Sequence, residues 1–124
     1  MKLLIADDDQ TLCLLLSAEM RSRGWKVDVA RDAMQTVMFA MRGQPDAILL
    51  DIQMPGGTGI DALKKLKASM KTRYIPVFVL SASDDPSIEA NARALGAAEF
   101  VRKPAEADVL HDLLRRTAGK EPRA

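Results

Sequence analysis

The sequence has a single cysteine and no long apolar segment. Because Cys13 stands alone, an internal disulfide is excluded, no Cys/His cluster points to zinc, and the thiol is expected to act as a small apolar side chain. The apolar run at residues 3–6 ends at Asp7, so it is too short for the core of a signal peptide. No stretch approaches the roughly 18 apolar residues that a membrane helix needs. We therefore expect a soluble, cytoplasmic protein with no membrane partner.

Neither sign of charge is in excess. The 124 residues include 18 Lys+Arg and 17 Asp+Glu, a net charge of +1, which gives no indication of a dedicated nucleic-acid or membrane surface. This length suits one compact domain with a substantial core. We place that domain at residues 1–118 and a polar tail at residues 119–124. With only Lys120 and Arg123 as cations, the tail is too short for a recognition domain, so we expect no nucleic-acid partner.

Short apolar runs alternate with amphipathic segments along the chain. We predict strands at residues 3–6, 26–30, 47–50, 76–80 and 99–102, and helices at residues 10–23, 32–42, 59–70, 86–96 and 106–117. Three of the runs are almost wholly apolar, which is typical of strands buried on both faces of a parallel sheet. Five strand–helix units in sequence predict an α/β fold, with right-handed crossovers and a doubly wound parallel five-stranded sheet.

The helical patterns also predict which side chains are buried. Leu15 belongs to the apolar positions of the first helix, and Met34, Met38 and Met41 recur at helical spacing in the second. We expect these methionines to fill the core. The third helix sets its apolar residues above a lysine-rich face. His111 lies on the last predicted helix, where we expect it to have no partner and no chemical role.

Polar side chains follow four of the predicted strands directly. Asp7 and Asp8 follow the first strand, Asp51 the third, Ser81 the fourth and Lys103 the fifth. Ligands of open α/β sheets bind beyond the carboxyl ends of the strands, so we expect these side chains to share one rim. Two ionised carboxylates about 5 Å apart repel by roughly 3 kcal/mol at an effective dielectric near 20. Either the pKa of one carboxyl rises or a cation lies among them, and oxygen ligands favour Mg²⁺.

This set of residues suits phosphoryl transfer. A carboxylate such as Asp51 can form an acyl phosphate, Ser81 can hydrogen-bond a phosphoryl oxygen, and Lys103 can place a positive charge beside it. Each residue also has an ordinary interpretation. The aspartates can cap the following helix, as we expect of Asp9, while the serine can form a turn and the lysine can lie in solvent. Only the combination, in order after successive strands, indicates a site.

Four segments carry a family resemblance. Residues 4–9, 49–55, 79–82 and 100–104 resemble the receiver domains of two-component response regulators, and the likeness extends over residues 1–117. The resemblance implies a flavodoxin-like (βα)5 fold with strand order 2-1-3-4-5. It also implies that the protein is a phosphoacceptor in a histidine–aspartate phosphorelay. Such a protein is not an enzyme, although it assists its own phosphoryl transfer and autodephosphorylation.

The resemblance implies a role for each residue around the acidic positions. Asp51 corresponds to the phospho-accepting aspartate. Asp8 and Asp51 correspond to direct ligands of Mg²⁺, Asp7 to an acidic neighbour that acts through water, and the backbone carbonyl of Gln53 to the remaining protein ligand.

The resemblance also assigns the residues that would respond to phosphorylation. Ser81 corresponds to a switch hydroxyl and Phe100 to an aromatic switch residue, although Phe100 also suits a core position. Lys103 corresponds to the lysine of the family motif, and Pro104 to the residue after it, whose peptide bond is commonly cis. Phosphorylation adds a charge of about −1.5 to −2, which would bias a two-state element. The implied output surface comprises the fourth helix, the fifth strand and the fifth helix.

The implied partners are a histidine kinase or phosphotransfer protein and a downstream protein target. The chain departs from the family pattern at Thr58, which with Gly59 replaces the usual Asp-Gly pair, and at Ala105, where a bulkier residue is common.

Two alternatives stay open: a receiver excised from a larger regulator or hybrid kinase, and a pseudo-receiver that binds protein without phosphorylation. A hydrolase is disfavoured because Gln53 stands where a second acid is needed. A nucleotide site is disfavoured because an acidic first loop repels phosphate.

Overall fold

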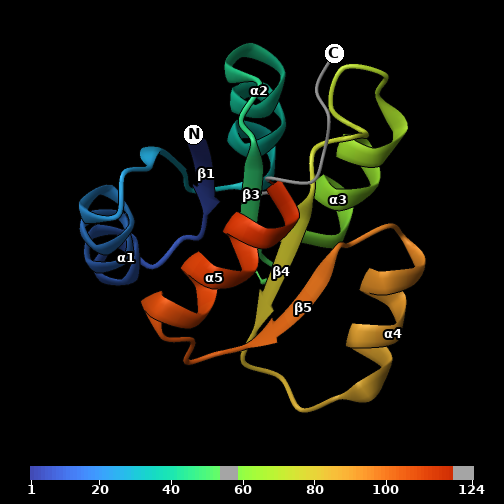
Figure 1. Ribbon diagram of the computed structural model, residues 1–124. Helices are drawn as coiled ribbons and strands as arrows, with labels where there is room; N and C mark the ends of the chain where they lie inside the picture. The colour runs from blue at the N-terminus through green and yellow to red at the C-terminus, as the bar shows by residue number, and fades with distance from the viewer. Residues whose placement is uncertain (54–58, 119–124) are drawn as a thin grey trace.

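Within residues 1–53 and 59–118, which the computed structural model describes, five strands alternate with five helices (Figure 1). The strands are β1 (Lys2–Ala6), β2 (Lys26–Ala30), β3 (Ala47–Asp51), β4 (Val77–Ser81) and β5 (Glu99–Arg102). The helices are α1 (Gln10–Ser22), α2 (Ala33–Gly43), α3 (Gly59–Ala68), α4 (Pro86–Ala94) and α5 (Ala107–Ala118). Residues 54–58 and the predicted tail at residues 119–124 lie outside the described part. No described helix is both long and apolar enough to span a membrane.

The five strands form one parallel sheet in the order β2-β1-β3-β4-β5. This arrangement confirms the predicted α/β fold and strand order. Helices α2, α3 and α4 pack against one face of the sheet, and α1 and α5 against the other (Figure 1). The chain therefore forms three layers, with the sheet buried between two layers of helices.

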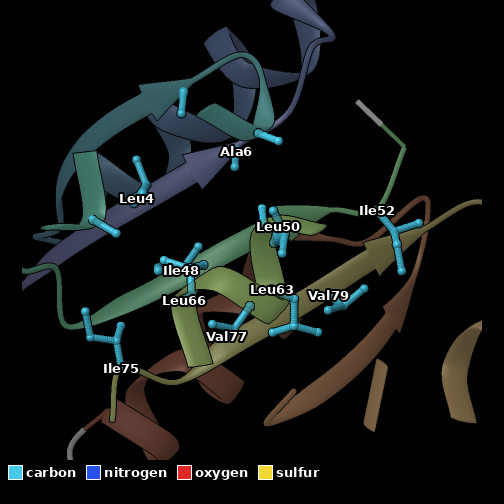
Figure 2. Packing of buried hydrophobic residues seen from close by; sticks show 14 of the residues in the cluster. Leu4, Ala6, Ile48, Leu50, Ile52, Leu63, Leu66, Ile75, Val77 and Val79 are labelled. Carbon is cyan, nitrogen blue, oxygen red and sulfur yellow. The ribbon is translucent and has the colours of Figure 1, made fainter. Parts of the chain in front are cut away.

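The core is divided by the sheet into two clusters. Alternate residues of a strand point to opposite faces, so Ile48 and Leu50 of β3 pack toward α2 and α3 while Leu49 packs toward α1 and α5. Figure 2 shows the first of these clusters, in which Leu63 and Leu66 of α3 lie over the strands. Every residue of β3 and β4 is buried. Each large apolar side chain among them contributes about 1.5–3 kcal/mol, which explains the nearly continuous apolar runs.

Aspartates begin three of the helices. The Asp9 carboxylate accepts a hydrogen bond from Leu12 N at the start of α1, as expected for this residue. Asp32 and Asp85 cap α2 and α4 in the same manner. These caps satisfy backbone N–H groups that have no partner within the helix. The Asp9 side chain therefore caps α1.

The methionines of α2 contradict the prediction that they fill the core. Met34 is 70% exposed, Met38 39% and Met41 38%. The buried positions of α2 are instead Ala33, Thr36 and Ala40. Small side chains allow the helix to approach the sheet closely, and the methionines lie on the flank of the helix beside them. Periodicity identified an apolar stripe correctly but did not show that a neighbouring stripe of small residues faces the core.

Leu15 and His111 also differ from prediction. Leu15 is 64% exposed, because the core-facing stripe of α1 runs through Cys13, Leu16 and Met20. His111 does have a partner, since Trp25 Nε1 donates a hydrogen bond to its Nδ1 at 3.0 Å, with the two rings perpendicular. Trp25 and His111 are far apart in sequence, so no local pattern could reveal the pair.

Candidate functional site

The carboxyl ends of four strands bring the predicted site residues to one edge of the sheet. Asp7 directly follows β1, Asp51 ends β3, Ser81 ends β4, and Lys103 directly follows β5. Backbone hydrogen bonds hold these positions, among them the one from Lys103 N to the Ser81 carbonyl at 2.8 Å. Parallel pairing places successive strand ends side by side, so residues widely separated in sequence meet here.

Three carboxylates form an acidic cluster, defined as Asp7, Asp8 and Asp51. One carboxylate oxygen from each lies within 4.8 Å of the others. Asp7 is 1% exposed and Asp51 5%, whereas Asp8 is exposed. Two buried carboxylates at this distance repel strongly unless a positive charge lies close to them.

Lys103 supplies such a charge. Its Nζ donates a hydrogen bond to Asp7 Oδ2 at 2.7 Å and lies 3.5 Å from Asp51 Oδ1. Burial on its own would lower the pKa of Lys103, but the two carboxylates outweigh it and raise the pKa above its usual value. The ammonium is therefore held in its charged form between two buried carboxylates.

The carboxyl of Asp51 retains its proton more readily than an ordinary aspartate. Burial is the main cause, and the neighbouring Asp7 charge adds to it, so that the pKa of Asp51 rises from 3.8 to about 6. The Gln53 N–H, which donates to Asp51 Oδ1 at 3.2 Å, and the Lys103 charge offset part of this rise. A single lysine thus does not neutralise the site.

The donor set of the acidic cluster fits a hard divalent cation. All three side chains offer carboxylate oxygens, which Mg²⁺ prefers, and Lys103 sets only one positive charge against these three carboxylates. Gln53 lies two residues beyond Asp51 with an exposed side chain. The use of its carbonyl as a ligand stays a prediction.

Ser81 and Phe100 lie on adjacent strands near the cluster. Ser81 is fully buried, and its Oγ accepts a hydrogen bond from Ser83 N at 3.1 Å, which leaves the hydroxyl proton free for another acceptor. Phe100 is half-buried and packs against the core cluster of α2, α3 and α4. The Lys103–Pro104 peptide bond is cis. The switch roles of Ser81 and Phe100 stay predictions.

Sequence reasoning missed two contributors to this site. Cys13 Sγ donates a hydrogen bond to the Asp7 carbonyl at 3.3 Å, and burial raises the pKa of the thiol to about 11, so that it stays protonated. Gly59 is the second contributor, because a Cβ there would meet the Asp51 carbonyl oxygen and lie 2.5 Å from Ile52 Cα. The position of Gly59 in the segment that follows Asp51 is the sequence feature that could have indicated its contact with the site. No sequence feature indicated the contact of Cys13 with Asp7.

Comparison with known proteins agrees with this geometry. Residues 3–115 match the family described as response regulator receiver domain. Protein PilH of Pseudomonas aeruginosa is 30% identical over 109 residues, which cover 88% of this chain and 90% of PilH. Response regulator PleD of Caulobacter vibrioides is 35% identical over 103 residues, which cover 83% of this chain but only 23% of PleD. The chain therefore spans a minor part of some of its relatives.

Solved structures show the same fold. The receiver domain of the sensor histidine kinase PA1611 from Pseudomonas aeruginosa superposes with a TM-score of 0.88 at 28% identity, covering 96% of this chain and 98% of that one. That structure holds a magnesium ion coordinated in its active site cleft. The receiver domain of the Francisella response regulator 1452 gives a TM-score of 0.89 at 26% identity, with 98% of each chain covered.

Proposed function

Because the chain belongs to the response regulator receiver domain family, we propose that it receives a phosphoryl group on Asp51 from a histidine kinase or phosphotransfer protein. One observation carries this proposal: the Asp51 carboxylate is buried beside Asp7 and Lys103, in a cluster of oxygen ligands that one lysine does not neutralise. Burial of its charge lowers the stability of the fold, so packing alone does not account for a carboxylate at this position.

The chemistry assigns a distinct role to each residue. A carboxylate oxygen of Asp51 attacks the phosphorus of a phosphohistidine, the P–N bond breaks, and the imidazole leaves as the acyl phosphate forms. Lys103 Nζ stabilises negative charge on a phosphoryl oxygen, and Ser81 donates its hydroxyl proton to another. Asp7, Asp8, Asp51 and the Gln53 carbonyl would hold Mg²⁺, whose charge supplies further stabilisation when it is bound.

The same residues would allow the phosphoryl group to be lost again. Attack of water on the phosphorus returns Asp51 to its carboxylate form, which makes the chain a phosphoacceptor with autodephosphorylation rather than an enzyme acting on an external substrate. This chemistry would serve a chain of this length or a receiver within a longer protein. A cytoplasmic place of action stays a prediction.

The output would pass through β5 to the surface of α4, β5 and α5. Ser81 is linked to the residue that follows β5 by the hydrogen bond from Lys103 N, and Arg102 of β5 forms an ion pair with Asp84 of the β4–α4 loop. A phosphoryl group on Asp51 would draw the Ser81 hydroxyl toward it and favour an inward position of Phe100. We infer that a downstream protein binds the surface changed in this way.

The experiment is phosphorylation by acetyl phosphate with Mg²⁺, followed by intact mass. We expect one added phosphoryl group on the wild type, none on Asp51→Asn, and unchanged labelling of Asp9→Asn, whose carboxylate only caps α1. Beryllofluoride with Mg²⁺ should shift the amide signals of Ser81 and Phe100 in NMR spectra. Labelling of Asp51→Asn equal to that of the wild type would refute the assignment, and no labelling of the wild type would favour a pseudo-receiver.

A further inference from the structure

The methionines of α2 form an exposed apolar stripe. Met34, Met38 and Met41 are spaced four and three residues apart, so they lie along one side of the helix over two turns. Apolar side chains grouped at the surface of a globular protein indicate an interaction site more often than single exposed ones do. Methionine is flexible and polarisable, and it adapts to partner surfaces. We call these three residues the methionine stripe.

The methionine stripe lies on the flank of α2 that faces α3. On the opposite flank, Phe39 and Gly43 border a pocket of about 260 Å³ together with Asp28 of β2, so that flank faces the β2 edge of the sheet. At 3.6 residues per turn the stripe lies roughly across the helix from this pocket. Helices α2 and α3 pack against each other on the same face of the sheet (Figure 1). The stripe therefore lies next to α3.

Helix α3 and the turn after it carry a concentration of positive charge. Residues 64–73 contain five cations and no acidic residue, although the whole chain has a net charge of only +1. Four of these cations are exposed: Lys64, Lys65, Lys71 and Arg73. Among the described residues none of the four forms an ion pair, whereas the arginines of α4, β5 and α5 do. We call these four residues the basic patch.

The basic patch adjoins the methionine stripe through Lys65. On α3, the Lys67 side chain packs against Gly96 at the end of α4, so that flank of α3 faces α4. Lys65, two residues earlier, lies on the opposite flank and faces α2. Lys65 and Lys67 in the last turn also favour the helix by opposing its dipole. That effect does not account for Lys71 and Arg73, which follow the helix.

We propose that the methionine stripe and the basic patch together bind an acidic amphipathic helix of a partner protein. Three apolar anchors over two turns match the spacing of one face of a helix, and exposed lysines beside them match acidic residues on its flanks. Nucleic acid would use the cations but not the methionines. A bilayer would favour larger, fully exposed apolar anchors than two methionines that are less than half exposed. This surface is separate from the α4, β5 and α5 surface of the proposed output.

The test is a binding titration with a synthetic helical peptide of about twenty residues, with leucines along one face and glutamates on both flanks. We expect the peptide to shift amide signals of α2, α3 and the turn after α3. Lys65→Glu/Lys71→Glu should weaken binding about tenfold or more, because two charges are reversed. Met34→Ser, at the most exposed of the three methionines, should also weaken it. A peptide of the same composition in scrambled order should bind at least about tenfold more weakly.

Matched controls and competing ligands decide the outcome. Lys26→Glu/Arg116→Glu reverses two exposed cations outside this surface, on β2 and α5, and should leave the peptide affinity unchanged. Thermal unfolding should show that all variants are folded. The proposal is overturned if the peptide does not bind, if Lys65→Glu/Lys71→Glu binds it as tightly as the wild type, or if the shifted signals lie on α4, β5 and α5. Binding of phosphatidylglycerol vesicles or duplex DNA in place of the peptide, with the same dependence on Lys65 and Lys71, would also overturn it.

Discussion

Replacing the Asp51 carboxylate by the neutral amide of asparagine should stabilise the fold above neutral pH. The pKa of Asp51 is about 6 in the folded protein against an ordinary value of 3.8, mainly because the carboxyl is buried. Below about pH 4 the group is protonated in both the folded and the unfolded chain. Between pH 4 and 6 the unfolded chain releases the proton first, so the wild type loses stability as the pH rises.

The size of this effect follows from the difference in pKa. At about 1.4 kcal/mol for each pKa unit, a rise of about two units corresponds to about 3 kcal/mol of stability lost above pH 6. The asparagine side chain resembles the protonated carboxyl in shape and charge. Asp51→Asn should therefore be more stable than the wild type by up to about 3 kcal/mol at pH 8, and nearly equal to it at pH 4.

Urea unfolding followed by the fluorescence of Trp25, the single tryptophan, measures both proteins at both pH values. Trp25 is buried in the cluster under α1 and α5, away from the substitution. Mg²⁺ should narrow the difference in stability between the two proteins at pH 8. A Mg²⁺ concentration ten times the dissociation constant adds about 1.4 kcal/mol to the stability of the wild type alone. An Asp51→Asn protein that is no more stable than the wild type at pH 8, or that is more stable by the same amount at pH 4, would contradict this prediction.

Three further substitutions test the neighbouring residues. Asp8→Ala should weaken Mg²⁺ binding about tenfold or more with little loss of stability, because Asp8 is exposed; isothermal titration calorimetry measures the affinity, and an unchanged value removes Asp8 from the site. Lys103→Met should destabilise the fold by about 3 kcal/mol at pH 8, because Asp7 loses its partner at 2.7 Å; a loss under about 1 kcal/mol in urea unfolding contradicts this. Gly59→Ala should cost about 2 kcal/mol or more, because the added Cβ lies 2.5 Å from Ile52 Cα; an unchanged melting temperature contradicts it.

Each substitution has a matched control. Asp28→Ala removes an exposed carboxylate far from the acidic cluster, and Lys26→Met removes an exposed lysine. Gly43→Ala adds a Cβ whose nearest neighbour is 3.6 Å away, which is an ordinary contact. These three substitutions should leave the Mg²⁺ affinity unchanged. They should change the stability of the fold by no more than about 1 kcal/mol.

Much of the architecture was predictable because it depends on local patterns. Continuous apolar runs identified β3 and β4, since strands covered on both faces have no polar side. Ligands bind beyond the carboxyl ends of parallel strands, and this rule alone predicts a site at Asp7, Asp51 and Lys103. The motifs along the chain therefore sufficed to predict the strand order, through the family resemblance. The positions of the polar residues directly after the strands predicted the edge of the sheet at which the acidic cluster forms.

Tertiary structure alone decided the properties that depend on distance and burial. The pKa of Asp51 rises because the folded chain buries its carboxyl, and the sequence does not show how deeply it is buried. That Lys103 lies closer to Asp7 than to Asp51 is likewise a matter of three-dimensional distances. The hydrogen bond between Trp25 and His111 joins residues that no periodic pattern connects. The exposure of the methionine stripe has the same origin, because a helix with two candidate apolar stripes buries the one that fits closest to the sheet. Sequence periodicity describes one helix or strand at a time, whereas burial and electrostatics depend on which other elements pack against it.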